Sequence, residues 1–207
     1  MARGIALWIS RFLFAAGFII LGYCGADWLN STLRQSLGNR DLDRLLSNNP
    51  APSIRTAPLA DGALLGRVEI PKLHLSAVVF QGTDSSVLDD GVGHLDGSAL
   101  PGQNGNVVLA AHRDSYFRGL RNIKRGDLIT VTTQTGIRKY SVESTRIVSP
   151  TDISVAYPTP QPTLTLITCY PFYYVGHAPK RFIVRALAQP LMTKVVDKVV
   201  HRQPISE

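Results

Sequence analysis

Apolar residues dominate the start of the chain. Apart from Ser10 and Arg11, residues 4–26 are apolar, and the stretch from Phe12 to Ala26 is uninterrupted. A helix that crosses a bilayer needs about 20 apolar residues, and the segment reaches this length when residues 5–9 are included. Basic residues near its start favour an N-terminus in the cytoplasm. The pattern predicts a transmembrane helix within residues 1–27 that anchors the rest of the chain outside the cytoplasm.

The same segment also fits a secretory signal peptide, with Cys24-Gly25-Ala26 as the cleavage site. We favour an uncleaved anchor, because Cys24 is larger than the residues preferred at that position. A lipoprotein signal is a poorer match, since Tyr23 stands where a small residue is needed. Under each interpretation, the remaining chain lies outside the cytoplasm.

Residues 28–62 have the pattern of a connecting segment. Apolar residues at helical spacing predict a juxtamembrane helix over residues 28–46, broken near Gly38. Prolines at positions 50, 52 and 58 then predict a semi-rigid spacer. At the other end of the chain, apolar residues on one helical face predict a helical tail over residues 191–207.

Residues 63–190 have the pattern of a globular domain rich in short β-strands. Clusters of Gly, Pro, Asn and Asp separate the apolar runs, which is typical of an all-β barrel or sandwich. A helical turn is predicted after His112, with Phe117, Leu120 and Ile123 on its apolar face. The predicted strands are residues 67–70, 73–80, 106–112, 127–133, 137–148, 163–169 and 181–187.

Composition and charge narrow the classes of function. Of 207 residues, 44% are hydrophobic, which excludes a disordered chain. The net charge of +7 suggests an anionic neighbour. The basic residues are scattered along the chain and no nucleic-acid-binding motif is present, so we predict no nucleic-acid partner. Two cysteines are too few for a disulfide framework or a structural zinc site.

Cys169 is the strongest candidate for a chemically active residue. It ends an apolar run that begins at Thr163, and Pro171 follows, which places the thiol where a strand meets a loop. A small buried cysteine is the alternative, although such a residue would more naturally lie in mid-strand. A nucleophilic thiol needs a base or a cation nearby to form the thiolate.

His112 and Arg181 are the candidate partners of this thiol. His112 follows an apolar strand, so it too lies where a strand meets a loop. Arg181 opens the last strand, and antiparallel pairing with the strand that ends at Cys169 would bring the guanidinium to the thiol. The other histidines are less suitable: His74 lies in a predicted strand, His94 in a glycine-rich turn, His177 in a loop and His201 in the tail.

These segments resemble the signature of the sortase family. Thr165-Leu-Ile-Thr-Cys169 is similar to its Thr-Leu-x-Thr-Cys signature, and Arg181 stands where the family's active-site arginine does. Gly105 to Asp114 resembles the family's histidine segment, although Ala111 stands where glycine is more usual. The resemblance covers about residues 65–188 and is greatest to class D sortases. Further matching segments are Val68-Glu-Ile-Pro-Lys-Leu, Gly91-Val-Gly-His94 and Ile123-Lys-Arg-Gly-Asp-Leu-Ile.

The resemblance implies a membrane-anchored cysteine transpeptidase on an eight-stranded β-barrel with short helices. It implies that Cys169 attacks a C-terminal L-P-x-T-G-like sorting signal, that His112 acts as acid and base, and that Arg181 holds the substrate backbone or the oxyanion. The partners would be the protein that carries the signal and an amine acceptor of the cell envelope. The residues expected to bind the signal are Ile153, Val155, Ala156, Tyr157, Thr168 and Tyr170.

No cofactor and no metal are expected. The aspartates that could offer oxygen ligands lie in different loops, and none of them forms the alternating acidic pattern of a calcium loop. We interpret them as turn-forming or solvated carboxylates.

Three other classes of protein are weaker alternatives. An L,D-transpeptidase typically has histidine close before cysteine in one short cluster, which is absent here. A papain-like protease has cysteine before histidine, the reverse of the order of His112 and Cys169. A membrane-tethered β-barrel binding module, in which Cys169 is structural, is the non-enzymatic alternative.

Overall fold

The computed structural model describes residues 2–47, 59–173 and 176–190. Most of the predicted spacer and the whole predicted C-terminal tail lie outside these residues. In chain order the elements are α1 (Ala2–Ser47), β1 (Leu64–Ile70), η1 (Pro71–Leu73), β2 (Leu75–Gln81), α2 (Ser85–Asp90), β3 (Val92–His94), β4 (Asn106–Ala110), η2 (Arg118–Asn122), β5 (Leu128–Thr133), β6 (Gly136–Val148), η3 (Ile153–Ala156), β7 (Thr163–Tyr170) and β8 (Lys180–Ala188).

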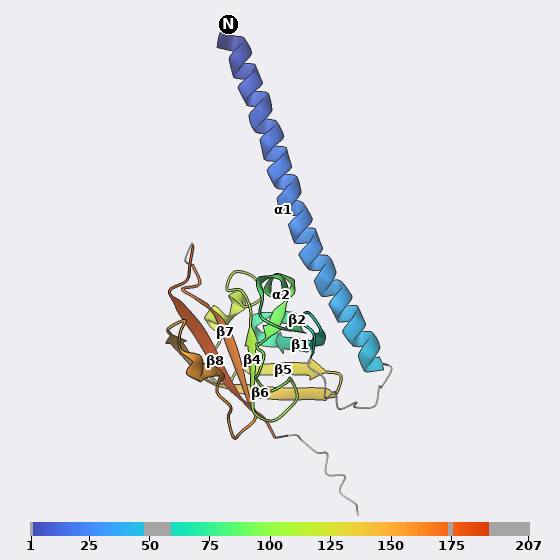
Figure 1. The fold of residues 1–207 in the computed structure, drawn as a ribbon, viewed down its shortest axis with the longest axis vertical. Helices are drawn as coiled ribbons and strands as arrows, with labels where there is room; N and C mark the ends of the chain where they lie inside the picture. Colours follow the sequence, from blue (N-terminus) through green and yellow to red (C-terminus); the bar gives the residue numbers. More distant parts are fainter. Residues whose placement is uncertain (1, 48–58, 174–175, 191–207) are drawn as a thin grey trace, which may run out of the picture.

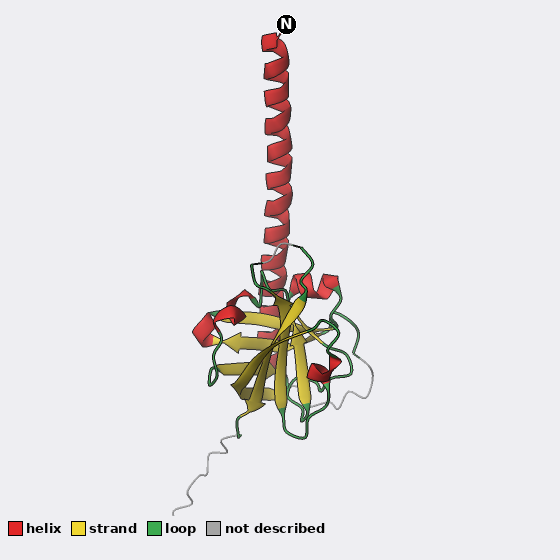
Figure 2. Ribbon diagram, turned by 90° about the vertical axis from the view of Figure 1, so that its left-hand side faces the viewer, coloured by secondary structure: helices red, strands yellow, loops and turns green. Residues whose placement is uncertain are grey.

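The strands form one closed barrel in the order β1-β2-β3-β4-β7-β8-β6-β5. The β2–β3 and β4–β7 pairs are parallel and the others are antiparallel, so the barrel is mixed. Figure 2 shows the strands wrapped around the core, with short helices at the margin. The predicted eight-stranded β-barrel with short helices is thus confirmed.

The predicted turn around His94 is wrong, because residues 92–94 form strand β3, parallel to β2. A Cβ on Gly93 would lie 2.3 Å from the carbonyl oxygen of Gly82. Glycine is needed here because two backbones approach closely, rather than because the chain turns. His74 is also displaced from its predicted strand: it follows η1 with a φ of 50° and is exposed.

The predicted helical turn after His112 is the 3-10 helix η2, which begins at Arg118. The apolar face was predicted correctly, since Phe117, Leu120 and Ile123 are all buried in the barrel core. The connection between β4 and β5 is therefore fixed at several points by side chains that enter the core.

Helix α1 is 46 residues long and runs through Gly38, so the predicted break there is wrong. At this point α1 lies against β2, and a Cβ on Gly38 would lie 3.2 Å from the Val78 side chain. Leu42 is fully buried, and Gln35 Oε1 accepts a hydrogen bond of 3.2 Å from the Val78 N–H. The C-terminal part of α1 thus packs on the barrel, while its N-terminal part extends away from it (Figure 1).

The predicted transmembrane helix is not confirmed. Within the part of the chain that the structure describes, no helix is both long and apolar enough to cross a membrane.

Candidate active site

Strand pairing brings Cys169, His112 and Arg181 to one end of the barrel. β4 and β7 are parallel, with Ala110 opposite Ile167, so they end at the same edge. Cys169 lies near the end of β7, and His112 follows β4 by two residues. β8 pairs antiparallel with β7 and places Arg181 directly opposite Cys169. The strand pairing predicted from the sequence is therefore confirmed.

Thr168 ties the two parallel strand ends together. Its Oγ1 donates a hydrogen bond of 2.8 Å to the carbonyl oxygen of Ala111, and the Ala111 N–H donates to the Ile167 carbonyl at 3.2 Å. Only 2% of Thr168 is exposed, so its side chain does not face a ligand. In the structure Thr168 supports the residues next to it, and its binding of substrate stays a prediction.

The three candidate catalytic side chains line one pocket of about 300 Å³. Arg181 Nη1 donates to the carbonyl oxygens of Ala178 at 3.3 Å and Lys180 at 3.1 Å. Among the described residues, its Nε and Nη2 have no hydrogen-bond partner, so these donors are open to a ligand. The other lining residues are Arg113, Asp114, Gly176, His177 and Ala178.

His112 has an acidic neighbour that sequence reasoning did not assign to it. Its Nε2 lies 3.3 Å from Oδ1 of Asp89, on α2, and the two side chains are 41% and 70% exposed. Solvent screens such a pair, whose contribution to stability is about 0–1 kcal/mol. Within the described residues no hydrogen bond joins His112 to Cys169, and such contacts often tighten only when substrate binds.

The segment between β7 and β8 is fastened by Arg113, a second residue that the sequence did not reveal. Its Nη1 donates to the Pro171 carbonyl at 3.1 Å and its Nη2 to the Gly176 carbonyl at 3.0 Å. Tyr170, which we expected to bind substrate, packs its ring with Phe172 and Phe182. It is not part of the pocket lining.

The other predicted substrate-binding residues lie apart from this pocket. Ile153, Val155 and Ala156 belong to η3, and Tyr157 follows it. Asn106 holds the segment: its Nδ2 donates to the carbonyl oxygens of Val155 and Tyr157, each at 3.0 Å.

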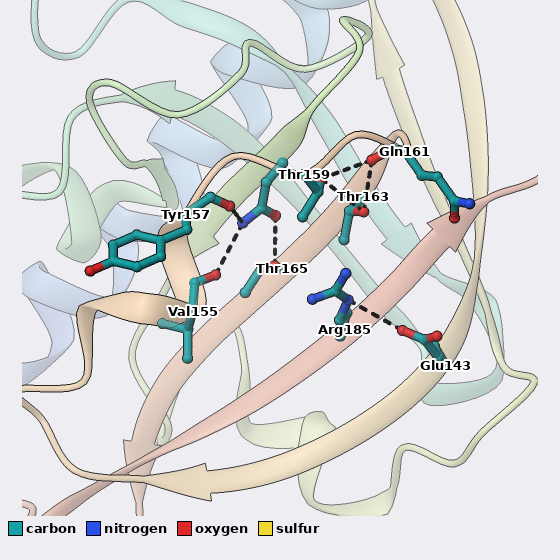
Figure 3. A network of polar contacts seen from close by, with 9 residues as sticks. Glu143, Val155, Tyr157, Thr159, Gln161, Thr163, Thr165 and Arg185 are labelled. Carbon is teal, nitrogen blue, oxygen red and sulfur yellow. Dashed lines mark hydrogen bonds and ion pairs between the residues drawn. The ribbon is translucent and has the colours of Figure 1, made fainter.

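Thr165 completes this network, since its Oγ1 donates to Asn106 Oδ1 at 2.7 Å. Figure 3 shows Val155 and Tyr157 beside Thr165 of β7. Asn106 and Thr165 are each 3% exposed, because the β6–β7 segment covers the outer face of β4 and β7 here. This cover lies near the start of the two strands, whereas Cys169 lies near the end of β7.

The remaining titratable candidates have structural surroundings. His94 is buried, its Nδ1 lies 3.0 Å from Gln81 Oε1, and its Nε2 lies 2.9 Å from the Ala99 carbonyl oxygen. Burial lowers the pKa of His94 below its ordinary value. Among the described residues, no group of three or more His, Cys, Asp and Glu side chains could hold a metal ion.

A thiol, an imidazole and a guanidinium around one pocket are the groups of a cysteine-dependent acyl-transfer enzyme. Residues 68–189 match the family model described as the sortase domain. The chain is 33% identical over 189 residues to sortase D of Bacillus subtilis, a match that covers 85% of this chain and 95% of that protein.

Solved structures agree with this match. A Clostridium perfringens sortase D5 transpeptidase is 26% identical with a TM-score of 0.63, and the match covers 74% of this chain and 99% of that one. Sortase A of Corynebacterium diphtheriae is 26% identical with a TM-score of 0.60, over 79% of this chain and 86% of that one. The chain belongs to the sortase family and is a sortase-type cysteine transpeptidase.

Proposed function

We propose that this sortase cleaves a C-terminal L-P-x-T-G-like sorting signal through a thioester on Cys169 and transfers the acyl group to an amine of the cell envelope. The observation that supports the proposal most is that Cys169, His112 and Arg181 share one pocket. No metal or cofactor is needed, because the reaction exchanges one amide bond for another.

The two half-reactions use the same pair of residues in opposite directions. In the first, the Cys169 sulfur attacks the threonine carbonyl carbon, the C–N bond to glycine breaks, and protonated His112 gives a proton to the leaving amine. In the second, the acceptor amine attacks the thioester, neutral His112 takes its proton, and Cys169 leaves as the thiolate.

Arg181 would stabilise the oxyanion that forms in each half-reaction, or hold the substrate backbone. The contacts of Nη1 with Ala178 and Lys180 orient the guanidinium, and its remaining donors form a planar fork. The Arg181→Lys variant would retain little activity, because an ammonium group cannot reproduce that planar fork.

The signal would lie along the outer face of β4 and β7, from Cys169 towards η3. An extended peptide rises about 3.3 Å per residue, so residues before the cleaved bond would reach the β6–β7 segment. Ile153 and Tyr157 are 67% and 56% exposed there, which leaves both side chains free to contact the leucine and proline of the signal, together with Val155 and Ala156.

The N-terminal part of α1 would attach the enzyme to the membrane, with the barrel outside the cytoplasm. This proposal is supported by large apolar side chains that are 62–75% exposed along α1 and costly to leave in water. They are Trp8, Phe12, Leu13, Phe14, Phe18, Ile19, Ile20, Leu21 and Tyr23. The full chain should stay with bacterial membranes after a carbonate wash; its release in soluble form would contradict the proposal.

The acyl transfer is tested with a fluorescent sorting-signal peptide and an amine acceptor, with mass spectrometry of the protein. An adduct should form on Cys169, and Cys169→Ala should have no activity. His112→Ala and Arg181→Ala should each lower kcat/KM about 100-fold or more. His177→Ala is the matched control, since it changes a pocket residue without an assigned role. Turnover by the Cys169→Ala variant would overturn the proposal.

A further inference from the structure

A second pocket lies between η1 and η2 and has a volume of about 550 Å³. The proposed acyl transfer makes no use of it, and it shares no lining residue with the catalytic pocket. Its lining residues are Lys72, Leu73, His74, Gly119, Arg121, Asn122, Ile123 and Lys124.

The fold gathers basic side chains here that are scattered along the chain. Lys72 and His74 come from the β1–β2 connection, while Arg121 and Lys124 come from the β4–β5 connection. Among the described residues, the one carboxylate paired with these four side chains is Asp127, which accepts a 2.6 Å hydrogen bond from Lys72. The charge of Asp127 balances that of Lys72, but Arg121 and Lys124 add further positive charge, so the pocket attracts anions.

The backbone is strained at His74, one of the basic residues that line the pocket. His74 has φ 50° and ψ 35°, the left-handed conformation, which is unfavourable for a residue with a side chain. A hydrogen bond of 3.0 Å from its N–H to the Pro71 carbonyl holds this turn. The turn leaves His74 exposed at the pocket lining, and strain of this kind is frequent where a protein binds a ligand.

Arg121 links this pocket to the catalytic end of the barrel. Its Nη1 donates to the Tyr173 hydroxyl at 2.8 Å, and its guanidinium lies 5.3 Å from the centre of the Tyr173 ring. Tyr173 belongs to the β7–β8 connection, which also supplies His177 and Ala178 to the catalytic pocket. An anion that binds Arg121 therefore competes with a contact of this connection.

We propose that the pocket between η1 and η2 is a binding site for a phosphate group, held by Arg121 and Lys124 with His74 beside them. Arg121 offers a planar fork that matches two phosphate oxygens, and Lys124 offers a compact positive charge. The phosphate belongs either to a lipid headgroup or to a soluble phosphate-bearing molecule. The site does not depend on the proposed acyl transfer.

The test is calorimetric titration of the full chain with inorganic pyrophosphate, in a neutral detergent at constant ionic strength and without sorting signal. Binding should be saturable, and the double variant Arg121→Gln/Lys124→Gln should weaken it about tenfold or more. The control is Lys139→Gln/Arg146→Gln, which removes the same charge from exposed positions on β6. Circular dichroism checks that both variants are folded.

Equal weakening by both double variants would overturn the proposal, because it would show attraction to net charge alone. Absence of saturable binding up to about 10 mM pyrophosphate would also overturn it.

The same titration in nanodiscs of neutral or anionic phospholipid distinguishes the two sources of phosphate, a lipid headgroup and a soluble molecule. Loss of binding in anionic discs assigns the site to lipid headgroups, and an unchanged affinity assigns it to a soluble molecule. Neither result alters the test of acyl transfer on Cys169.

Discussion

Thr168 and Asp89 both make contacts next to the catalytic residues, but the contact of Thr168 is buried and that of Asp89 is exposed to solvent. The hydroxyl of Thr168 is buried against the Ala111 carbonyl, whereas the Asp89 carboxylate contacts His112 at the surface. A buried hydrogen bond is costly to remove, because the remaining group finds no water. A surface ion pair is screened and contributes little. Isosteric substitution should therefore have a large effect at Thr168 and a small effect at Asp89.

Thr168→Val should lower the free energy of unfolding by about 1–3 kcal/mol, because the Ala111 carbonyl loses its donor in a buried position. It should also lower kcat/KM, since His112 follows Ala111 directly and loses part of its support. Chemical denaturation and peptide turnover measure the two effects. Thr168→Ser keeps the hydroxyl and should stay close to the native values; an unaffected Thr168→Val enzyme would show that the hydrogen bond is dispensable.

Asp89→Asn should change kcat/KM less than about fivefold, because the pair with His112 is exposed and the amide can still accept a hydrogen bond. The comparison is with His112→Ala under the same assay. A loss as large as that of His112→Ala would contradict this expectation and would make Asp89 a positioning residue for the imidazole.

At the scale of elements, Asn106 joins strand β4 to the β6–β7 segment, which the sorting signal would reach in the proposed reaction. Asn106→Asp replaces a donor that faces two carbonyl oxygens with a buried negative charge, which is strongly unfavourable. The β6–β7 segment should then detach, so that KM for the signal peptide rises about tenfold or more and limited proteolysis within residues 149–162 becomes faster.

Asn104→Asp is the matched control for this substitution. Asn104 is exposed, and its Oδ1 accepts from Arg138 at 3.3 Å, so an acid is tolerated there. Equal effects of the two substitutions on KM would mean that Asn106 does not position the β6–β7 segment.

Sequence patterns predicted the long strands well, because burial imposes a regular alternation on them. β6 and β7 end within one residue of their predicted bounds. β3 has only three residues, two of which flank a glycine required by a close backbone approach, and no periodicity develops over that length. Gly38 was misinterpreted for a related reason: it marks a contact between α1 and β2 rather than a break.

Some residues of the candidate site could be predicted from the sequence, and others could not. Cys169, His112 and Arg181 are visible in the sequence because each lies where a strand meets a loop, and the register then brings them together. Arg113 and Asp89 act through partners on other connections, and the paths of those connections depend on the whole barrel. No local pattern reports such contacts. The catalytic roles themselves stay predictions.

At the scale of the whole molecule, basic residues that are scattered along the sequence come together in the fold. A net charge of +7 suggested a general attraction to anions, whereas the fold concentrates cations from two connections at one pocket. Asp127 beneath this pocket is almost fully buried. Burial raises its pKa, but hydrogen bonds and charge from Lys72 and Lys124 lower it more, so its pKa is below the ordinary value. Asp127 therefore stabilises the fold above about pH 4, and this stability is lost as the pH falls through its lowered pKa.

His94 should set the stability of the barrel in mildly acidic solution. It is 1% exposed, and burial lowers its pKa below 6.5, although the hydrogen bond with the Ala99 carbonyl and the charge of Asp96 act in the opposite direction. Below that pH the unfolded chain binds a proton that the folded chain still excludes. The free energy of unfolding should thus fall as the pH drops from 6.5 towards the lowered pKa, by at most about 1.4 kcal/mol per pH unit from this residue.

Urea denaturation of the full chain between pH 7.5 and 5.0 measures this slope. His94→Asn should be less stable at pH 7.5, because it loses buried contacts, and its stability should vary less with pH than that of the native chain. His177→Asn changes an exposed histidine and should keep the native slope. If the His94→Asn chain loses stability as steeply as the native one, the pH dependence comes from other groups, and the buried imidazole is only a packing element between β2 and β4.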